Sequence, residues 1–246
     1  MSNRFAKDVA LITGGSKGIG RAIALRLARE GAAVAITWFR DRESSEKTVA
    51  ELQELGARAH CMKAFLGAEE VPARIVEEVR RELGEPSILV SNAASGVQKP
   101  LAEIDKSHWE WTFETNAAAF LRLVQAAPHL RAALAMTSLG SERVLAGYGL
   151  VGASKAALES LVRYLAVEMA PACRVNAISA GVVETDSLRR FPAAKVIIDE
   201  ALGKTPAGRL VQPEDVSDLA TFLLSDEAKM ITGQTIVIDG GSSILA

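Results

Sequence analysis

The stretch VALITGGSKGIG, residues 9–20, decides the fold of this chain. Its first five residues are apolar or β-branched, as in a strand that is buried on both faces of a sheet. Gly14, Gly18 and Gly20 follow at once, and an apolar helical pattern begins at Ile19. A glycine-rich turn between a strand and a helix lets the backbone approach a diphosphate, which the helix N-terminus attracts. The stretch therefore predicts a dinucleotide-binding turn rather than an ordinary connection.

The alternation of strand and helix continues along the whole chain. Six more short apolar runs are expected to be strands, at residues 33–37, 57–62, 87–91, 133–138, 174–179 and 235–239. Helical patterns separate them, and one helix is predicted to open with Ser107 and Glu110 as a capping box. Such alternation predicts an α/β fold, a doubly wound Rossmann-type parallel sheet with helices on both faces.

The 246 residues, 49% of them hydrophobic, are enough for one domain with a sizeable core, and we expect a single domain over residues 1–246. The region 183–212 interrupts the alternation and contains Pro192 and Pro206. Long segments of this kind often cover a binding site. We therefore expect a substrate flap there.

Composition excludes several classes of function. A net charge of −2 and a pI near 6.0 argue against nucleic acid or an anionic membrane as the main partner. The two cysteines and three histidines show no metal-ligand spacing, so no metal site is expected. Widely separated cysteines and the absence of an N-terminal apolar signal or a membrane-length run favour a reducing, cytoplasmic setting.

Further motifs follow the glycine turn. Its spacing is Gly-x-x-x-Gly-x-Gly, and later the chain has Asn92-Ala93-Ala94, Asn116, Ser138, Lys155 and the C-terminal run GQTIVIDGG, residues 233–241. In this combination the sequence resembles the short-chain dehydrogenase/reductase family. The resemblance covers nearly the whole chain and implies a nicotinamide cofactor. The cofactor-binding residues that it implies are Gly14, Ser16, Lys17, Gly18, Ile19, Gly20, Arg40, Phe65, Leu66, Asn92, Ala93, Ala94 and Lys155.

The end of the second strand indicates which nicotinamide cofactor binds. An NAD site usually has a carboxylate near this point, to hold the ribose 2′-hydroxyl. Here Thr37, Trp38 and Phe39 precede Arg40, and Lys17 adds a second cation from the glycine turn. Two cations suit a 2′-phosphate, so NADPH is expected. The alternatives are that both cations are solvated surface charges, or that Asp41 pairs with Arg40.

Phe65 and Leu66 depart from the family pattern. After the third strand the family often has Asp or Asn in contact with adenine, and here Phe65 stands in that place. The contact with adenine is then expected to be apolar or through the backbone.

The tyrosine of this chain is displaced. Most short-chain reductases have Tyr-x-x-x-Lys, but the residue four before Lys155 is Val151. Ser138 lies thirteen before Val151, the family's usual interval from serine to tyrosine, so the alignment holds and the tyrosine alone has moved. Tyr148, seven before Lys155, gives the Tyr-x6-Lys spacing of enoyl-acyl carrier protein reductases. The chain is most similar to the NADPH-dependent type called enoyl-acyl carrier protein reductase III.

This resemblance implies a reaction and its catalytic residues. We expect NADPH-dependent reduction of the 2,3 double bond of a trans-2-enoyl thioester, carried by acyl carrier protein or CoA. In an enoyl thioester, charge develops on the thioester oxygen, and Tyr148 is expected to stabilise it. Lys155 is expected to bind the nicotinamide ribose and orient the cofactor. Ser138 either contacts the substrate or only ends its strand. The alternative for Tyr148 is that it has no catalytic role and is a turn residue packed on the sheet edge.

Two other functions stay open at this stage. One is reduction of a 3-ketoacyl thioester or another ketone with Tyr148 as the donor. The other is non-catalytic NADP binding, since the usual tyrosine position holds a valine. By resemblance the protein is also expected to be a homotetramer, assembled through helices near residues 107–131 and 152–169.

Overall fold

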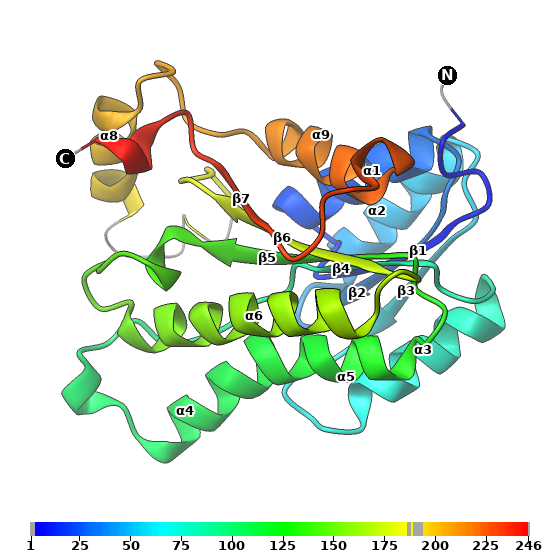
Figure 1. The fold of residues 1–246 in the computed structure, drawn as a ribbon, viewed down its shortest axis with the longest axis horizontal. Coiled ribbons are helices and arrows are strands. Elements are labelled where there is room, and N and C mark those ends of the chain that lie inside the picture. Colours follow the sequence, from blue (N-terminus) through cyan, green and yellow to red (C-terminus); the bar gives the residue numbers. More distant parts are fainter. Residues whose placement is uncertain (1–2, 186–187, 189–193, 246) are drawn as a thin grey trace.

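The computed structural model describes residues 3–185, 188 and 194–245. Seven strands form one parallel sheet in the order β3-β2-β1-β4-β5-β6-β7 (Figure 1). The strands are β1 Val9–Thr13, β2 Ala33–Trp38, β3 Ala59–Lys63, β4 Ile88–Ser91, β5 Ala132–Ser138, β6 Arg174–Ala180 and β7 Thr235–Ile238. The order reverses between β1 and β4, and such switch points are where doubly wound sheets bind ligands.

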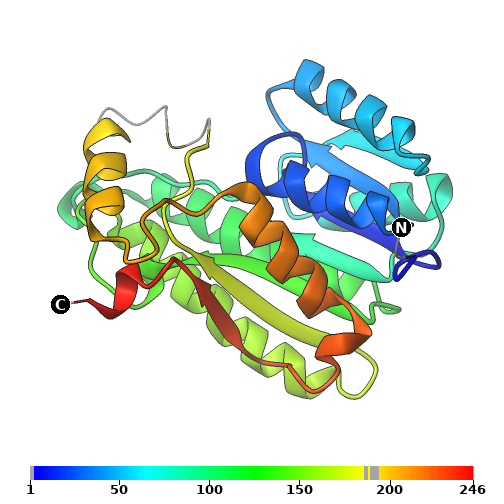
Figure 2. The same ribbon diagram turned by 90° about the horizontal axis from the view of Figure 1, so that it is seen from above.

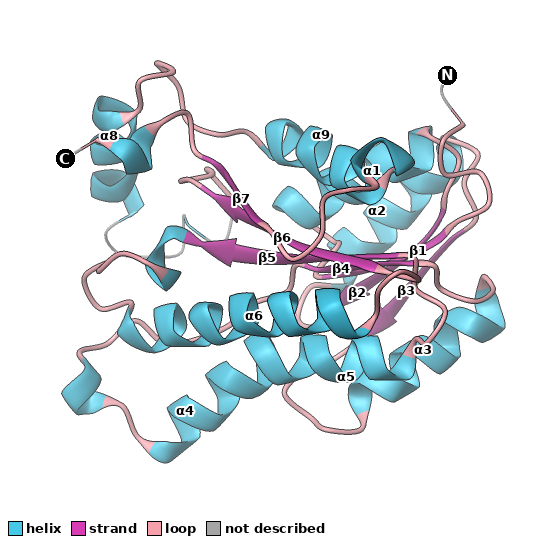
Figure 3. Cartoon of the chain, viewed as in Figure 1, coloured by secondary structure: helices cyan, strands magenta, loops and turns pink. Residues whose placement is uncertain are grey.

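Helices cover both faces of the sheet (Figure 3). The core on one face is built with α1, α2 and α9, and that on the other with α3, α5 and α6. The helices are α1 Gly18–Arg29, α2 Arg42–Glu54, α3 Val71–Glu82, α4 Lys106–Phe113, α5 Ala119–Ala126, α6 Gly149–Glu168, α8 Ala194–Lys204 and α9 Pro213–Leu224. Short 3₁₀ segments lie at Leu101–Glu103, Leu139–Ser141, Asp226–Ala228 and Ser242–Ile244, and a π-helical segment, Glu114–Ala118, joins α4 to α5. The predicted doubly wound α/β fold is confirmed.

The central strands β1, β2 and β4 are largely apolar because both faces of the sheet are covered. Successive residues of β1 alternate between the two cores: Val9 and Leu11 pack on the α3 side, and Ala10 and Ile12 on the α1 side. A strand with one solvated face would need a polar residue at every second position. The central strands therefore fix the layered architecture.

The predicted strand ends lie within one residue of the observed ends, except at the start of the third strand, and the predicted cap of one helix is wrong. The third strand begins at Ala59, because Ala57 closes the turn after α2 by donating its N–H to the Leu52 carbonyl. The helix predicted to open with Ser107 and Glu110 begins at Lys106 instead. Asp105 is its N-cap and accepts the His108 N–H at 2.9 Å, and Ser107 only adds a hydrogen bond to the Asp105 carboxylate.

The region predicted as a flap, residues 183–212, lies partly outside the described residues, at 186–187 and 189–193. Its described parts include helix α8 and a parallel bridge between Val183 and Val211. Helix α8 lies beside the C-terminal segment in both views (Figures 1 and 2). Among the described residues, no helix combines the length and apolar character needed to span a bilayer.

Candidate active site

The glycine turn forms a tight cradle at the N-terminus of α1. A Cβ on Gly20 would stand 2.4 Å from the Gly14 carbonyl oxygen and 2.5 Å from Asn92 Nδ2, so only glycine fits there. The Asn92 amide donates to the carbonyl oxygens of Thr13 and Gly14, at 3.0 Å each. Thr37 Oγ1 accepts the Gly14 N–H at 3.1 Å. The turn is thus held from the neighbouring strands before any ligand arrives.

A groove of about 520 Å³ runs along this cradle. Eleven of the predicted cofactor-binding residues line it: Gly14, Ser16, Lys17, Gly18, Ile19, Arg40, Phe65, Leu66, Asn92, Ala93 and Ala94. Gly20 supports the groove from behind, and Lys155 is not among its lining residues. The other lining residues, which are not among the predicted cofactor-binding residues, are Thr37, Trp38, Phe39, Asp41, Ala64, Ser95, Trp111, Thr115 and Thr185. Trp111 and Thr115 are four residues apart, which predicts that they share one helix face but not that this face meets the groove.

The groove has the chemistry that a phosphorylated dinucleotide requires. Helix α1 begins at Gly18 with no acidic residue in its first turn, so its N–H groups and dipole favour an anion. Thr115 Oγ1 is the one buried side-chain oxygen or nitrogen in the described residues that has no hydrogen-bond partner. Such orphaned atoms are rare in folded proteins, and a bound group at this groove could supply a partner. The residues present therefore fit NADPH.

Lys17 and Arg40, the two cations predicted to bind a 2′-phosphate, lie in different surroundings. Lys17 Nζ lies 2.5 Å from Asp41 Oδ2, so the carboxylate that was expected to weaken Arg40 pairs with Lys17 instead. Lys17 and the Ser44 N–H hold the pKa of Asp41 at about 2, and this carboxylate is ionised. Arg40 lies over the Phe39 ring, 5.6 Å from its centroid. Arg40 is therefore the better placed cation for a 2′-phosphate.

Tyr148 and Ser138 meet at the end of β5. The Tyr148 hydroxyl lies 3.2 Å from Ser138 Oγ, although ten residues separate them. Ser138 ends β5, and Tyr148 is the residue directly before α6. Burial raises the pKa of the Tyr148 phenol, and the hydrogen bond with Ser138 lowers it by less. The phenol therefore keeps its proton at neutral pH and can donate a hydrogen bond.

Close packing at two glycines brings this tyrosine to the serine. A Cβ on Gly140 would stand 2.4 Å from Tyr148 Cδ1, so the ring lies directly against the Gly140 backbone. A Cβ on Gly152 would stand 2.3 Å from the Gly140 carbonyl oxygen. The loop after β5 therefore lies against the first turn of α6, with the ring between them.

Val151 occupies a different environment from Tyr148. It is 7% exposed, and its Cγ2 would stand 2.5 Å from a Cβ on Gly96. Thr112 lies at the same point, so Val151 packs against the segment after β4 and against α4. A larger side chain could not fit without moving that segment. The position four before Lys155 is thus an apolar packing position in this chain.

Lys155 is buried on α6, 5% exposed, and its Nζ donates to the Met136 carbonyl at 2.7 Å. Asn116 lies in the π-helical segment and joins α6 to the loop after β4: its amide binds the Ser95 backbone and donates to Ser154 Oγ at 2.9 Å. Asn116 is therefore a structural connector in this state, while the lysine ammonium is held by the sheet. Within the described parts of the chain, no cluster of three or more His, Cys, Asp and Glu residues could hold a metal ion.

Residues 14–243 match the family model described as enoyl-(acyl carrier protein) reductase. A 1-cyclohexenylcarbonyl-CoA reductase from Streptomyces collinus is 37% identical over 98% of this chain and 88% of its own length. The 3-oxoacyl-[acyl-carrier-protein] reductase FabG from Pseudomonas aeruginosa is 34% identical over 95% and 96%. The chain belongs to the short-chain dehydrogenase/reductase family.

Solved structures of this family agree with the fold and with the expected cofactor. A short-chain dehydrogenase from Burkholderia cenocepacia, in complex with NADP, superposes with a TM-score of 0.91 at 33% identity, over 98% of this chain and 100% of that one. A blue fluorescent protein from a metagenomic library, in complex with NADPH, superposes with a TM-score of 0.90 at 28% identity, with the same coverage. The family and fold predictions are thus confirmed.

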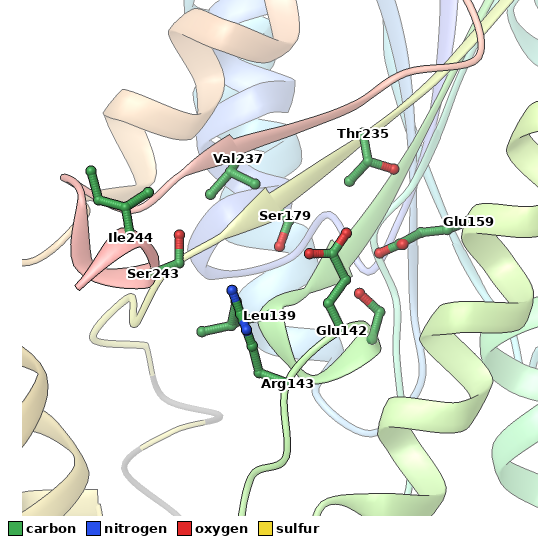
Figure 4. Close-up of a pocket in the computed structure, with 10 residues that line it drawn as sticks. Leu139, Glu142, Arg143, Glu159, Ser179, Thr235, Val237, Ser243 and Ile244 are labelled. Carbon is green, nitrogen blue, oxygen red and sulfur yellow. The ribbon is translucent and has the colours of Figure 1, made fainter. Parts of the chain in front are cut away.

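This family member has a second cavity, of about 220 Å³, behind the loop that follows Ser138 (Figure 4). Its walls include Glu142 and Arg143 from that loop, Glu159 from α6 and Ser179 from β6. Figure 4 shows the carboxylates of Glu142 and Glu159 pointing toward one another. Glu159 also accepts a hydrogen bond from Thr137 Oγ1 at 2.6 Å. The cavity therefore lies beside the middle of α6 and shares no lining residue with the groove.

Lys155 gives the protein a predicted pH dependence of stability. Burial lowers the pKa of its ammonium to about 8, with Glu159 acting in the opposite direction, whereas an unfolded lysine titrates near about 10.4. Between these values the unfolded chain binds the extra proton, so the free energy of unfolding rises with pH. The cost of burying the charge is complete below about pH 8 and disappears above about pH 10.

The measurement is urea unfolding of the wild type and Lys155→Met at about pH 7.5 and about pH 9.5. From the lower to the higher pH, the wild type should gain roughly 2 kcal/mol relative to the variant. Equal changes in the two proteins would mean that Lys155 does not titrate in this range.

Proposed function

We propose that this protein reduces the 2,3 double bond of a trans-2-enoyl thioester, carried by CoA or acyl carrier protein, with NADPH. The observation that carries the proposal is the placement of the phenol. Tyr148 lies within 3.2 Å of Ser138, and the position four before Lys155 is the buried Val151. The donor therefore stands before the first turn of α6 rather than within it.

The displaced donor suits an enoyl thioester. When bound, NADPH supplies the hydride that adds to Cβ of the substrate. Negative charge then develops on the thioester oxygen, which lies farther from the attacked carbon than a ketone oxygen does. The Tyr148 phenol, kept protonated by burial, would donate a hydrogen bond to that oxygen. Ser138 would orient the phenol through their shared hydrogen bond.

Lys155 would act on the ribose side of the site. Its ammonium is anchored by the Met136 carbonyl and keeps further N–H donors for ribose hydroxyls. Its charge also favours electron-rich oxygen nearby. In this role Lys155 positions the cofactor, while Tyr148 stabilises the substrate.

The relatives support both the leading function and one alternative. The 1-cyclohexenylcarbonyl-CoA reductase is named for a CoA thioester with a carbon–carbon double bond, as the proposal requires. The relative from Pseudomonas aeruginosa is named for a 3-oxoacyl substrate, so ketone reduction is the alternative that a specific observation favours. Non-catalytic NADP binding is the weaker alternative, because Tyr148 and Ser138 meet as a catalytic pair would.

Parallel assays separate these functions. NADPH oxidation would be followed with a trans-2-enoyl-CoA, with 1-cyclohexenylcarbonyl-CoA and with a 3-ketoacyl-CoA. Turnover of either enoyl substrate without comparable turnover of the ketone is the expected result. Turnover of the ketone alone would overturn the proposal in favour of the alternative, and NADPH binding without any turnover would favour a non-catalytic role.

The cofactor proposal makes a prediction at Arg40. Arg40→Ala should weaken NADPH binding by about tenfold to a hundredfold and leave NADH binding unchanged, because a charge-assisted contact to the 2′-phosphate is lost. Arg42→Ala is the matched control, since Arg42 is exposed and pairs with Glu46 at 2.7 Å on α2. Titration of intrinsic fluorescence would give the dissociation constants. A parallel loss of NADH binding would contradict a role in phosphate recognition.

We also propose that the protein assembles as a homotetramer through the helices near residues 107–131 and 152–169. Helix α6 supports this, because Tyr164 and Val167 on it are 67% and 79% exposed. Apolar side chains in such a row are commonly covered by a second copy. Light scattering would report four chains per particle, and Val167→Glu should reduce that number. A monomer at working concentration would contradict the proposal.

A further inference from the structure

The end of the groove formed after β2 and β3 is unusually aromatic. The lining residues there are Trp38, Phe39, Arg40 and Asp41 after β2, and Ala64, Phe65 and Leu66 after β3. In a doubly wound sheet, the base and ribose of the first nucleotide lie near the end of the second strand. The chemistry of these seven residues therefore determines how the adenine ring of NADPH is held.

Two phenylalanines present flat surface at this end. Phe39 and Phe65 are 43% and 42% exposed, and their ring centroids are 5.2 Å apart. Arg40 lies on the Phe39 ring, so the guanidinium continues the same surface. Large aromatic side chains are usually buried, and exposed ones in a groove suit stacking against a planar ring. Every base has such a face, so stacking does not distinguish one base from another.

The side chains of these residues offer almost no acceptor for the adenine 6-amino group, and the backbone carbonyls of Trp38 and Phe65 already accept the N–H groups of Ala64 and Ala68. Asp41 is the one side chain among these seven that can accept a hydrogen bond, and it is already engaged. Its Oδ2 pairs with Lys17 at 2.5 Å, and its Oδ1 accepts the Ser44 N–H at 3.0 Å as the N-cap of α2. Moving this carboxylate to the base would cost both the ion pair and the cap.

We propose that this protein binds the adenine of NADPH by stacking alone and does not recognise its 6-amino group, with Phe65 as the residue that removes base selectivity. Selection among nucleotides then rests on the 2′-phosphate. The inference rests on NADPH as the cofactor of the proposed function. Its test measures cofactor binding and therefore needs no acyl substrate.

The test compares NADPH with its purine analogue, in which hydrogen replaces the 6-amino group and the ring nitrogens are kept. Trp38 and Trp111 line the groove, so quenching of intrinsic fluorescence reports binding at equilibrium. The wild type should bind the two within about threefold of each other, because loss of a recognised amino group would cost about fivefold or more. A preference for NADPH of about fivefold or more would overturn the proposal. Failure to bind NADPH at all would instead refute the proposed cofactor.

Two variants at Phe65 separate selectivity from affinity. Phe65→Asp supplies an ionised acceptor and should create a preference of about tenfold for NADPH over the analogue. Phe65→Leu removes the ring and should weaken both ligands by a similar factor, about fivefold. Phe222→Leu, on α9 away from the groove, is the matched control and should change neither. A preference unchanged in Phe65→Asp would show that the base does not lie against Phe65.

Discussion

Replacing Tyr148 by phenylalanine is expected to lower kcat for an enoyl thioester by about a hundredfold to a thousandfold, the loss typical of one oxyanion donor. The substitution deletes only the hydroxyl that lies 3.2 Å from Ser138 Oγ, and the ring keeps its packing against Gly140. NADPH binding should stay within about twofold of the wild type, because the phenol acts on the substrate oxygen. Steady-state kinetics and a cofactor titration measure the two effects separately.

Tyr164→Phe is the matched control, since the chain has only two tyrosines and Tyr164 is exposed on α6. It should leave kcat unchanged. Full activity in Tyr148→Phe would remove the phenol from the mechanism and would leave Ser138 as the hydroxyl nearest to the proposed substrate oxygen.

Replacing Lys155 by methionine should lower kcat/KM by at least about a hundredfold and weaken NADPH binding by about tenfold or more. The two side chains are similar in length, so the change removes a buried ammonium and its hydrogen bond to the Met136 carbonyl. Both effects are expected because this ammonium would hold the ribose and so orient the cofactor for hydride transfer. Tyr148→Phe, in contrast, should affect turnover alone.

Lys47→Met is the control, because Lys47 is exposed and pairs with Glu43 at 2.7 Å on α2. It should change neither binding nor turnover. If Lys155→Met binds NADPH like the wild type but turns over slowly, the lysine acts on the phenol and does not hold the ribose. Circular dichroism of each variant would confirm that it is folded.

The layered fold could be predicted from local patterns. A parallel strand that is buried on both faces needs mostly apolar residues, and the central strands β1, β2 and β4 have them, so the number of strands and their approximate positions follow from the sequence. The errors lie at the ends of strands and helices, where a single hydrogen bond determines which residue begins the element. The turn after α2 delays β3 to Ala59, and Asp105 rather than Ser107 caps α4. Several side chains can compete for a cap within three residues, and the pattern alone does not rank them.

The candidate site was predictable where it depends on spacing. The glycine turn, Asn92 and Arg40 lie together because parallel strands end at one edge of the sheet. The pairing of Asp41 with Lys17 rather than Arg40 was not predictable, since Arg40 is the neighbour of Asp41 in the sequence and only the fold brings Lys17 to it. Trp111 and Thr115 enter the groove from a helix that follows β4, and only the packing of that helix brings them there.

The sequence by itself determined the sheet, the cofactor turn and the displacement of the tyrosine from position 151 to 148. Each depends on residue type and local spacing, which can be read from the amino-acid sequence. Only the tertiary structure decided that Tyr148 reaches Ser138 and that Val151 is packed against Gly96. The reason is that both contacts join segments whose approach is set by backbone packing at Gly140 and Gly152, and such non-local contacts leave no periodic signal in the sequence.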